Sequence, residues 1–171
     1  LMSIDELPTV YMPSKEVRQW REMILHRKKI VCKAVQSKNR IRAVLKSQGY
    51  YCPEHKGGWW KRMNRLWMRR LCEGRFDVDS LWRIHLCNLM DELELLEKQL
   101  RDVTTYLDAY LSHQAGGKLL MSIPGVGRRT AEAILAYTDD IERFGNYKQY
   151  CSYFGLTPKL DESGSMKRLG H

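Results

Sequence analysis

A heptad repeat of apolar residues between positions 82 and 110 constrains the fold of this chain more than any other feature of its sequence. It places 9 apolar residues at alternating spacings of four and three, which is typical of an α-helix that buries one narrow stripe in a coiled coil. The stripe packs either on residues 14–48 of the same chain or on a second copy, and the two arrangements are compatible. We expect a homodimer or higher oligomer through residues 82–110. The repeat consists of Trp82, Leu86, Leu89, Leu93, Leu96, Leu100, Val103, Leu107 and Tyr110.

Two further helices are predicted before this repeat. Ser14 is placed to cap a long helix that runs without proline or glycine until Gly49. A shorter helix is predicted within residues 60–75. The expected fold is therefore all-α, with long antiparallel or coiled-coil helices followed by a small helical domain. The apolar positions at helical spacing are Val17, Trp20, Ile24, Val31, Ala34, Ile41 and Leu45 in the first helix and Trp60, Met63, Trp67 and Leu71 in the second.

Basic residues are concentrated in the first part of the chain. Residues 1–76 contain 18 Lys and Arg against 6 Asp and Glu, whereas residues 77–112 contain 3 against 8. An excess this one-sided favours an anionic partner, most simply nucleic acid, over a merely solvated helix face. We interpret the tryptophans of residues 60–75 as core and the basic side chains as candidates for phosphate contacts of RNA or DNA. These candidates are Arg27, Lys28, Lys38, Arg42, Lys61, Arg62, Arg65, Arg69 and Arg70.

The composition argues against several other classes of protein. No long apolar run is present, so neither a transmembrane helix nor a membrane partner is expected, and no signal peptide is recognisable. The 5 scattered cysteines favour free thiols in a reducing compartment, so we expect a cytoplasmic protein associated with the nucleoid. Cys52 and His55 lack a second ligand pair at the spacing of a zinc site, so no metal site is predicted.

Residues 122–135 read SIPGVGRRTAEAIL, which combines a tight turn with the start of an apolar helix. Such a turn between two helices places glycines where φ is positive and leaves backbone N–H groups free at the start of the second helix. Free N–H groups and the helix dipole attract anions, and two arginines add charge. The pattern predicts a helix-hairpin-helix that contacts DNA phosphates without reading bases. Its candidate contacts are Gly125, Val126, Gly127, Arg128, Arg129 and Thr130.

The last part of the chain carries a possible nucleophile. A short helix is predicted over residues 146–153 and ends at Gly155. Beyond it, Ser163 lies in a polar turn that contains glycine and is followed by basic residues. No His or Lys base is adjacent, so the local sequence alone favours an ordinary loop serine over a nucleophile.

Five motifs in this part of the chain occur together in one known family. They are Ile-Pro-Gly-Val-Gly at 123–127, Thr-Ala at 130–131, Arg-Phe at 143–144, Gly-Leu-Thr-Pro at 155–158 and Ser-Gly at 163–164. In order and spacing they resemble the carboxy-terminal domain of transposases of the insertion-sequence 110 family, which includes the Piv-type DNA invertases. Residues 6–31 and 38–45 also resemble the segment that follows the nuclease domain of that family. The resemblance covers essentially the whole chain.

The resemblance implies an organisation in three parts. Residues 1–13 correspond to a connector from a nuclease-like domain, in which four acidic residues outside this chain hold Mg2+. Asp5 and Glu6 fall in this connector and are not assigned to the metal. Residues 14–114 correspond to the basic helices and coiled coil, and residues 115–171 to a shortened carboxy-terminal transposase domain. No cofactor is expected in this chain itself.

The resemblance also implies a reaction. In the family, the serine of Ser-Gly, here Ser163, attacks a DNA phosphodiester, becomes linked to DNA, and is displaced by a second strand end. Gly164 leaves space beside this serine, and Lys167 and Arg168 are candidates for DNA phosphate contacts. Family members are guided by an RNA from the ends of their own element, and part of that contact is expected on residues 15–46 and 60–75. Isolated from the nuclease-like domain, this chain is expected to be inactive.

Two other hypotheses are compatible with the residues. The chain is alternatively a non-enzymatic helix-hairpin-helix module that binds DNA as a coiled-coil dimer, with Ser163 as an ordinary loop residue. A zinc-binding regulator that uses Cys52 and His55 is a weaker possibility. An acidic nuclease-like domain encoded upstream would favour the transposase, and stoichiometric metal would favour the regulator.

Overall fold

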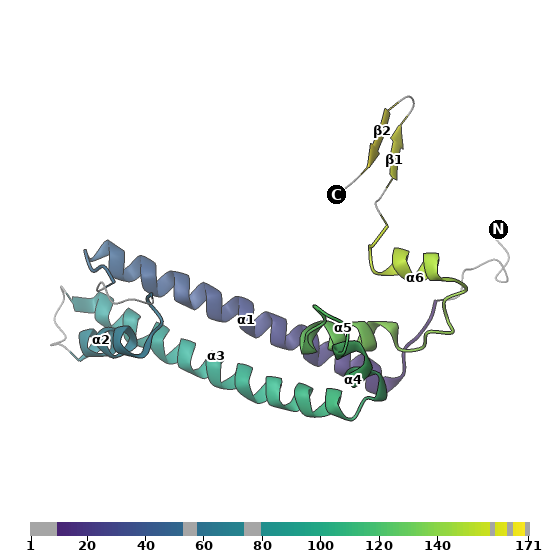
Figure 1. Ribbon diagram of the computed structural model, residues 1–171. Coiled ribbons are helices and arrows are strands. Elements are labelled where there is room, and N and C mark those ends of the chain that lie inside the picture. The colour runs from purple at the N-terminus through teal and green to yellow at the C-terminus, as the bar shows by residue number, and fades with distance from the viewer. Residues whose placement is uncertain (1–9, 53–57, 74–79, 158–159, 164–165, 170–171) are drawn as a thin grey trace, which may run out of the picture.

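The computed structural model of the chain describes residues 10–52, 58–73, 80–157, 160–163 and 166–169. Helices make up most of this part, and the predicted all-α architecture is confirmed for it (Figure 1). A two-stranded hairpin follows the last helix and was not predicted. The elements are α1 (Lys15–Ser47), α2 (Arg62–Cys72), α3 (Leu81–Ser112), α4 (Ala115–Met121), α5 (Arg128–Thr138), α6 (Tyr147–Tyr153), β1 (Leu160–Ser163) and β2 (Met166–Leu169).

Two long helices, α1 and α3, lie side by side and run in opposite directions (Figure 1). At one end the rings of Trp20 and Tyr110 lie 4.9 Å apart, and nearer the middle Lys38 pairs with Glu97 at 3.2 Å. The predicted start of α1 is confirmed, because the Ser14 side chain accepts a hydrogen bond from the backbone N–H of Val17. The short connection to α2 begins at Gly49, whose φ of 75° is the left-handed conformation that ends many helices.

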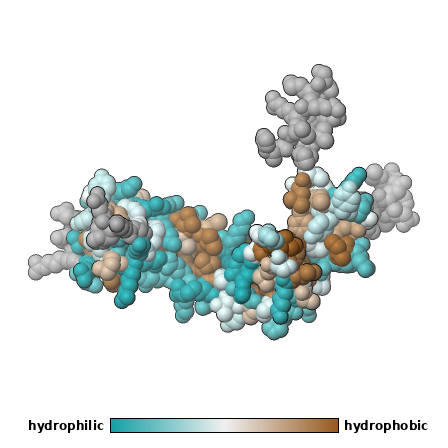
Figure 2. All heavy atoms as spheres, in the orientation of Figure 1, coloured by the Kyte–Doolittle hydropathy of each residue, from teal (hydrophilic) through white to brown (hydrophobic). Residues whose placement is uncertain are grey.

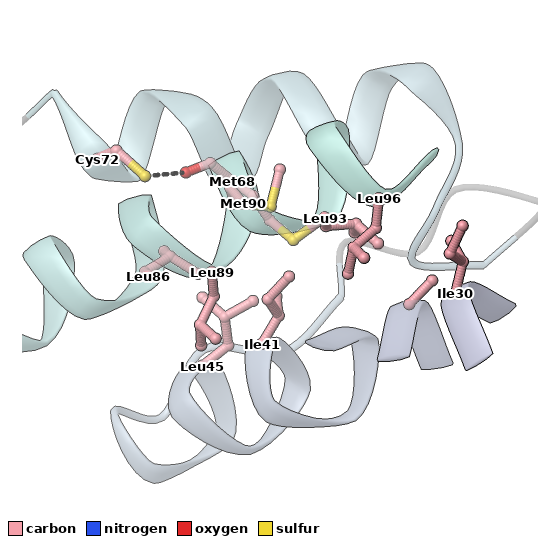
Figure 3. Packing of buried hydrophobic residues seen from close by; sticks show 11 residues of the cluster. Ile30, Ile41, Leu45, Met68, Cys72, Leu86, Leu89, Met90, Leu93 and Leu96 are labelled. Atoms are coloured by element: carbon pink, nitrogen blue, oxygen red, sulfur yellow. Dashed lines mark hydrogen bonds between the residues drawn. The ribbon is translucent and has the colours of Figure 1, made fainter. Parts of the chain in front are cut away.

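The heptad repeat of α3 packs against other helices of the same chain. Leucines of this repeat point toward Ile30, Ile41 and Leu45 of α1, and Met68 and Cys72 of α2 complete the cluster (Figure 3). The intramolecular alternative is therefore the one seen in the structure. A dimer through residues 82–110 stays a prediction, and it would have to use side chains of α3 that do not face α1. The buried leucines of the repeat are Leu86, Leu89, Leu93, Leu96 and Leu107.

Three positions of the predicted apolar stripes are on the surface, and Tyr110 at the end of the heptad repeat is one of them. Val31 of α1 is exposed and Ile30 is buried in its place, because the buried stripe follows a heptad spacing that passes through the polar residue Ser37. Met63 of α2 is also exposed, and Asn64 is buried instead. Asn64 is satisfied by donating a hydrogen bond from its side chain to the carbonyl oxygen of Gly58 at 2.8 Å.

The two small helices α4 and α5 pack on the end of the α1–α3 pair that carries Trp20. Gly116 and Gly117 lie inside α4. A Cβ atom at Gly116 would come within 2.8 Å of Leu135, and one at Gly117 within 2.9 Å of the Leu111 carbonyl oxygen. These glycines therefore allow α4 to approach α3 and α5 closely.

The residues after α6 form an antiparallel hairpin in which β1 pairs with β2. The sequence predicted a polar loop here. The register places Asp161 opposite Arg168 and Glu162 opposite Lys167, and opposite charges at facing positions favour such a pairing. In Figure 1 the hairpin stands beyond α6, away from the α1–α3 pair.

Candidate nucleic-acid interface

The turn between α4 and α5 shows some, but not all, of the backbone features predicted for an anion-binding turn. Gly125 has a φ of 86°, as predicted, but Gly127 is extended and serves as the residue before the first turn of α5. The N–H of Val126 is not free, because it donates to the Ile123 carbonyl oxygen at 3.0 Å. The N–H groups of Gly127 and Arg128 have no acceptor among the described residues. With those of Arg129 and Thr130, which also have no acceptor among the described residues, these backbone donors at the start of an 11-residue helix remain for an anion.

The side chains around this turn differ in their exposure and in whether they are paired within the protein. Thr130 is exposed on the first turn of α5, and the Arg128 side chain is 63% exposed. Arg129 is instead held by Asp108 of α3: its Nη1 lies 2.9 Å from Oδ1 and its Nη2 donates to Oδ2 at 3.2 Å. Arg128 reaches the same carboxylate only at 4.0 Å. Of the two arginines predicted to contact DNA, Arg129 is engaged within the protein.

Beneath Arg129 lies a buried carboxylate. The Glu132 side chain on α5 is 1% exposed and pairs with Arg27 of α1 at 2.7 Å. Arg129 approaches the same Glu132 oxygen at 3.6 Å. A buried charge is tolerated only when it is paired, so Arg27 is a structural partner of α5 and not a surface cation.

The far end of α5 is capped by two arginines. Arg21 of α1 donates to the carbonyl oxygens of Ala136 and Tyr137, and Arg143 donates to those of Tyr137 and Thr138. Cationic donors at a helix carboxy-terminus satisfy its free carbonyls and complement its dipole. The Arg-Phe motif at 143–144 therefore has a structural role here.

The segment before α1 contacts the same carboxy-terminal end of α5. The hydroxyl of Tyr11 donates to Asp139 Oδ2 at 2.6 Å, and this hydrogen bond raises the pKa of Tyr11. The Arg143 guanidinium lies over the rings of Tyr11, Phe144 and Tyr153 at 4.5, 4.2 and 4.5 Å from their centroids. One arginine thus holds together the lead-in segment, the end of α5 and α6.

Four of the basic residues predicted to contact RNA or DNA are ion-paired within the helical body. Besides Arg27, these are Lys38 and Arg65, which share Glu97 of α3 at 3.2 and 2.7 Å, and Arg69, which reaches Asp91 and Glu94 of α3. The hydrogen bond from Arg65 lowers the pKa of Glu97. The pairs of Arg65 and Arg69 join α2 to α3, whereas Lys38 joins α1 to α3. Lys38 and Arg65 also lie over the Trp60 ring.

The other predicted cations are on or near the surface. Lys28, Arg62 and Arg70 are exposed and form no ion pair with another described residue. Lys61 is exposed as well, and Arg42 is half-buried and hydrogen-bonded to Asn39. Figure 2 shows hydrophilic residues over much of the visible face of α1 and α3, interrupted by apolar patches.

The predicted nucleophile lies at the tip of the hairpin. Ser163 is the last residue of β1 and is opposite Met166 in the register. Lys167 and Arg168 lie in β2, so all three predicted residues share one hairpin. Gly164 and Ser165 lie outside the described residues.

Neither a metal site nor a disulfide is seen in the described part of the chain. Its His, Cys, Asp and Glu residues include no group of three placed to hold a metal ion, and His55 lies outside the described residues. The 5 cysteines are unpaired. Burial raises the pKa of Cys72 to about 12, so this thiol is unreactive at neutral pH. None of the described helices has the length and apolar character needed to span a membrane.

One family model covers both the turn and the hairpin. Residues 117–171 match the family model described as "Transposase IS116/IS110/IS902 family". The resemblance predicted from the five motifs is confirmed by this match, which runs from within α4 to the end of the chain.

Two curated proteins are similar to this chain. The "Probable family 20 transposase" of Pseudomonas aeruginosa is 29% identical over 86 residues, which cover 50% of this chain and 25% of that protein. The "Putative transposase y4rJ" of Sinorhizobium fredii is 28% identical over 170 residues, which cover 91% of this chain and 41% of that protein. The chain spans less than half the length of both relatives. No solved structure matches it significantly.

The acidic partners of Arg27 and Arg129 were not predicted from the sequence. Glu132 lies in an apolar helix far in sequence from its partner Arg27 of α1, and Asp108 lies in the heptad helix 21 residues from its partner Arg129 of α5. The one available signal was a charged residue inside an Ala-rich apolar helix, since a carboxylate at such a position is rarely buried without a partner.

Proposed function

We propose that this chain is part of a DNA transposase that contacts DNA phosphates through the α4–α5 turn and breaks and rejoins strands through Ser163. The observation that carries the proposal is the family match over residues 117–171, which contains both the turn and Ser163. The free N–H groups of Gly127 and Arg128 and the exposed side chain of Arg128 support phosphate binding. In this proposal the turn is a helix-hairpin-helix.

The proposed chemistry is a phosphoryl transfer with a covalent intermediate. The Ser163 Oγ forms a bond to a DNA phosphorus, the bond from that phosphorus to one deoxyribose oxygen breaks, and the serine proton ends on the released hydroxyl. A hydroxyl of a second strand then attacks the same phosphorus and releases the serine, so strands are exchanged without hydrolysis. Lys167 and Arg168, on the strand paired with that of Ser163, are proposed to contact the neighbouring phosphates.

The remaining parts of the proposal concern the whole protein. A nuclease-like domain outside this chain is expected to hold Mg2+, as the family resemblance implies. A guide RNA from the ends of the element is expected to contact exposed cations such as Lys28, Arg62 and Arg70. Assembly as a dimer or higher oligomer and a cytoplasmic location belong to the same proposal.

The test uses the intact transposase and a DNA substrate that carries the element end. Ser163→Ala is expected to abolish the denaturation-resistant protein–DNA adduct while DNA affinity changes less than about twofold, because a nucleophile acts in the transition state and not in ground-state binding. Ser165→Ala is the matched control and should keep the adduct. An adduct that survives Ser163→Ala would contradict the role of this serine. DNA binding without any adduct in the wild-type protein would favour the non-enzymatic DNA-binding module.

A further inference from the structure

Five charged side chains meet where α1, α3 and α5 come together: Arg27, Asp108, Arg128, Arg129 and Glu132. Three are cations and two are anions, so the cluster has a net charge of one positive unit. The distances within the cluster decide which cation carries that charge.

The charged side chains of the cluster pair with one another at unequal distances. Glu132 is nearly fully buried and lies 2.7 Å from Arg27 but 3.6 Å from Arg129, so it neutralises Arg27. Arg129 donates one hydrogen bond to Asp108 Oδ2 at 3.2 Å, and its Nη1 lies 2.9 Å from Oδ1 as an ion pair without hydrogen-bond geometry, so Asp108 neutralises Arg129. These two pairs cancel four charges and leave Arg128, whose side chain lies 4.0 Å from Asp108 and is 63% exposed.

We propose that Asp108 is a positioning residue for the turn: it holds Arg129 against α3 and leaves Arg128 as the one cation of the turn that contacts a DNA phosphate. The inference rests on the proposed function, in which the turn binds DNA. Arg129 then ties α5 to the α1–α3 pair, and DNA is recognised by Arg128 with the N–H groups of Gly127 and Arg128.

The salt dependence of DNA binding reports this division of roles. Each phosphate neutralised by a cation adds about 0.9 to the slope of log affinity against log salt, and one released counterion is worth about eightfold in affinity at 0.1 M salt. Asp108→Asn releases Arg129 from its partner and makes a second cation available to DNA. The variant is expected to bind a 20-bp duplex of unrelated sequence about five- to tenfold more tightly, with a slope steeper by about 0.9.

The matched control is Asp102→Asn, which removes the same charge from an exposed position of α3 that has no partner among the described residues. It should change affinity less than about twofold. The charge-neutral double variant Asp108→Ala with Arg129→Ala removes the pair as a whole and should keep the wild-type slope. Arg128→Ala should flatten the slope by about 0.9. All variants are compared as the 171-residue chain, with melting temperatures recorded alongside.

The possible outcomes separate the inference from the proposed function. The inference is overturned if Asp108→Asn binds no better than Asp102→Asn, or if the double variant loses about 0.9 from the slope, since Arg129 would then be a phosphate contact itself. If Arg128→Ala leaves the slope unchanged, the turn does not bind DNA phosphate, and that result overturns the proposed role of the turn as well.

Discussion

The guanidinium of Arg27 in α1 lies 2.7 Å from the carboxylate of Glu132 in α5, and this pair joins α5 to the long helix α1. Both side chains are largely removed from water, with 12% and 1% exposed. A buried pair gains little net stability over a well-packed apolar pair, because two charges lose their hydration. Breaking it is costly, since one charge is then buried without a partner.

Removal of one partner of this pair is therefore expected to destabilise the chain strongly. Glu132→Ala should lower the free energy of unfolding by about 3–5 kcal/mol, and the double variant Arg27→Met with Glu132→Leu should recover most of that loss. Urea denaturation of the single and double variants measures both values. A loss below about 1 kcal/mol for Glu132→Ala would mean that water reaches Arg27 in the folded protein.

The pair of Arg65 and Glu97 predicts how stability depends on pH. The hydrogen bond from Arg65 lowers the pKa of Glu97 from its ordinary value of 4.5. A carboxyl whose pKa is lower in the folded state stabilises the fold above the unfolded pKa, and the contribution is lost as the pH falls through the folded pKa. The difference in unfolding free energy between the wild type and Glu97→Gln should be constant from about pH 6 to 7 and shrink below about pH 4.5. A difference that stays constant down to pH 3 would contradict this assignment.

The heptad repeat predicts a contrast between two leucines of α3. Leu93 is fully buried against α1, whereas Leu95 is 57% exposed. Leu93→Ala should lower the unfolding free energy by about 2–5 kcal/mol, and Leu95→Ala by less than about 0.5 kcal/mol. Leu93→Lys with Leu100→Lys should unfold the chain and not merely separate dimers, because the repeat is part of the core. Light scattering and denaturation on the same samples distinguish these results.

Local patterns in the sequence predicted most of the fold. The caps at Ser14 and Gly155 and the apolar spacing of residues 82–110 depend on neighbours within one or two turns, and the structure confirms them. The partners of Arg65 and Arg129 depend instead on the register of antiparallel helices, which no short window of sequence fixes. Because these ion-pair partners could not be predicted, too many basic side chains were assigned to contacts with nucleic acid.

The hairpin at the end of the chain, unlike the helices, was not predicted from local sequence patterns. The acidic residues of β1 and the basic residues of β2 were interpreted as a polar loop, because strands of four residues show too little alternation to predict. The register that pairs these two segments depends on both of them together and is seen only in the structure.

Arg143 is expected to hold α6 on the end of α5. The variant Arg143→Lys keeps the charge but loses the planar group that donates to the carbonyl oxygens of Tyr137 and Thr138 and stacks on three rings. A hydrogen bond from a charged group is worth about 1.5–3 kcal/mol, so hydrogen exchange of amides in α6 should speed up by about tenfold or more. Amides of α3 near Leu93 should exchange at the wild-type rate, because that part of the core does not touch Arg143.

The control for Arg143→Lys is Arg101→Lys, at an exposed position of α3 without a partner among the described residues. This change should leave exchange in α6 unaltered. The turn that is proposed to bind DNA lies at the opposite end of α5, so Arg143→Lys should also leave the salt dependence of DNA binding unchanged. Exchange in α6 at the wild-type rate would show that Phe144 and Tyr150, whose rings lie 5.1 Å apart, hold α6 without help from Arg143.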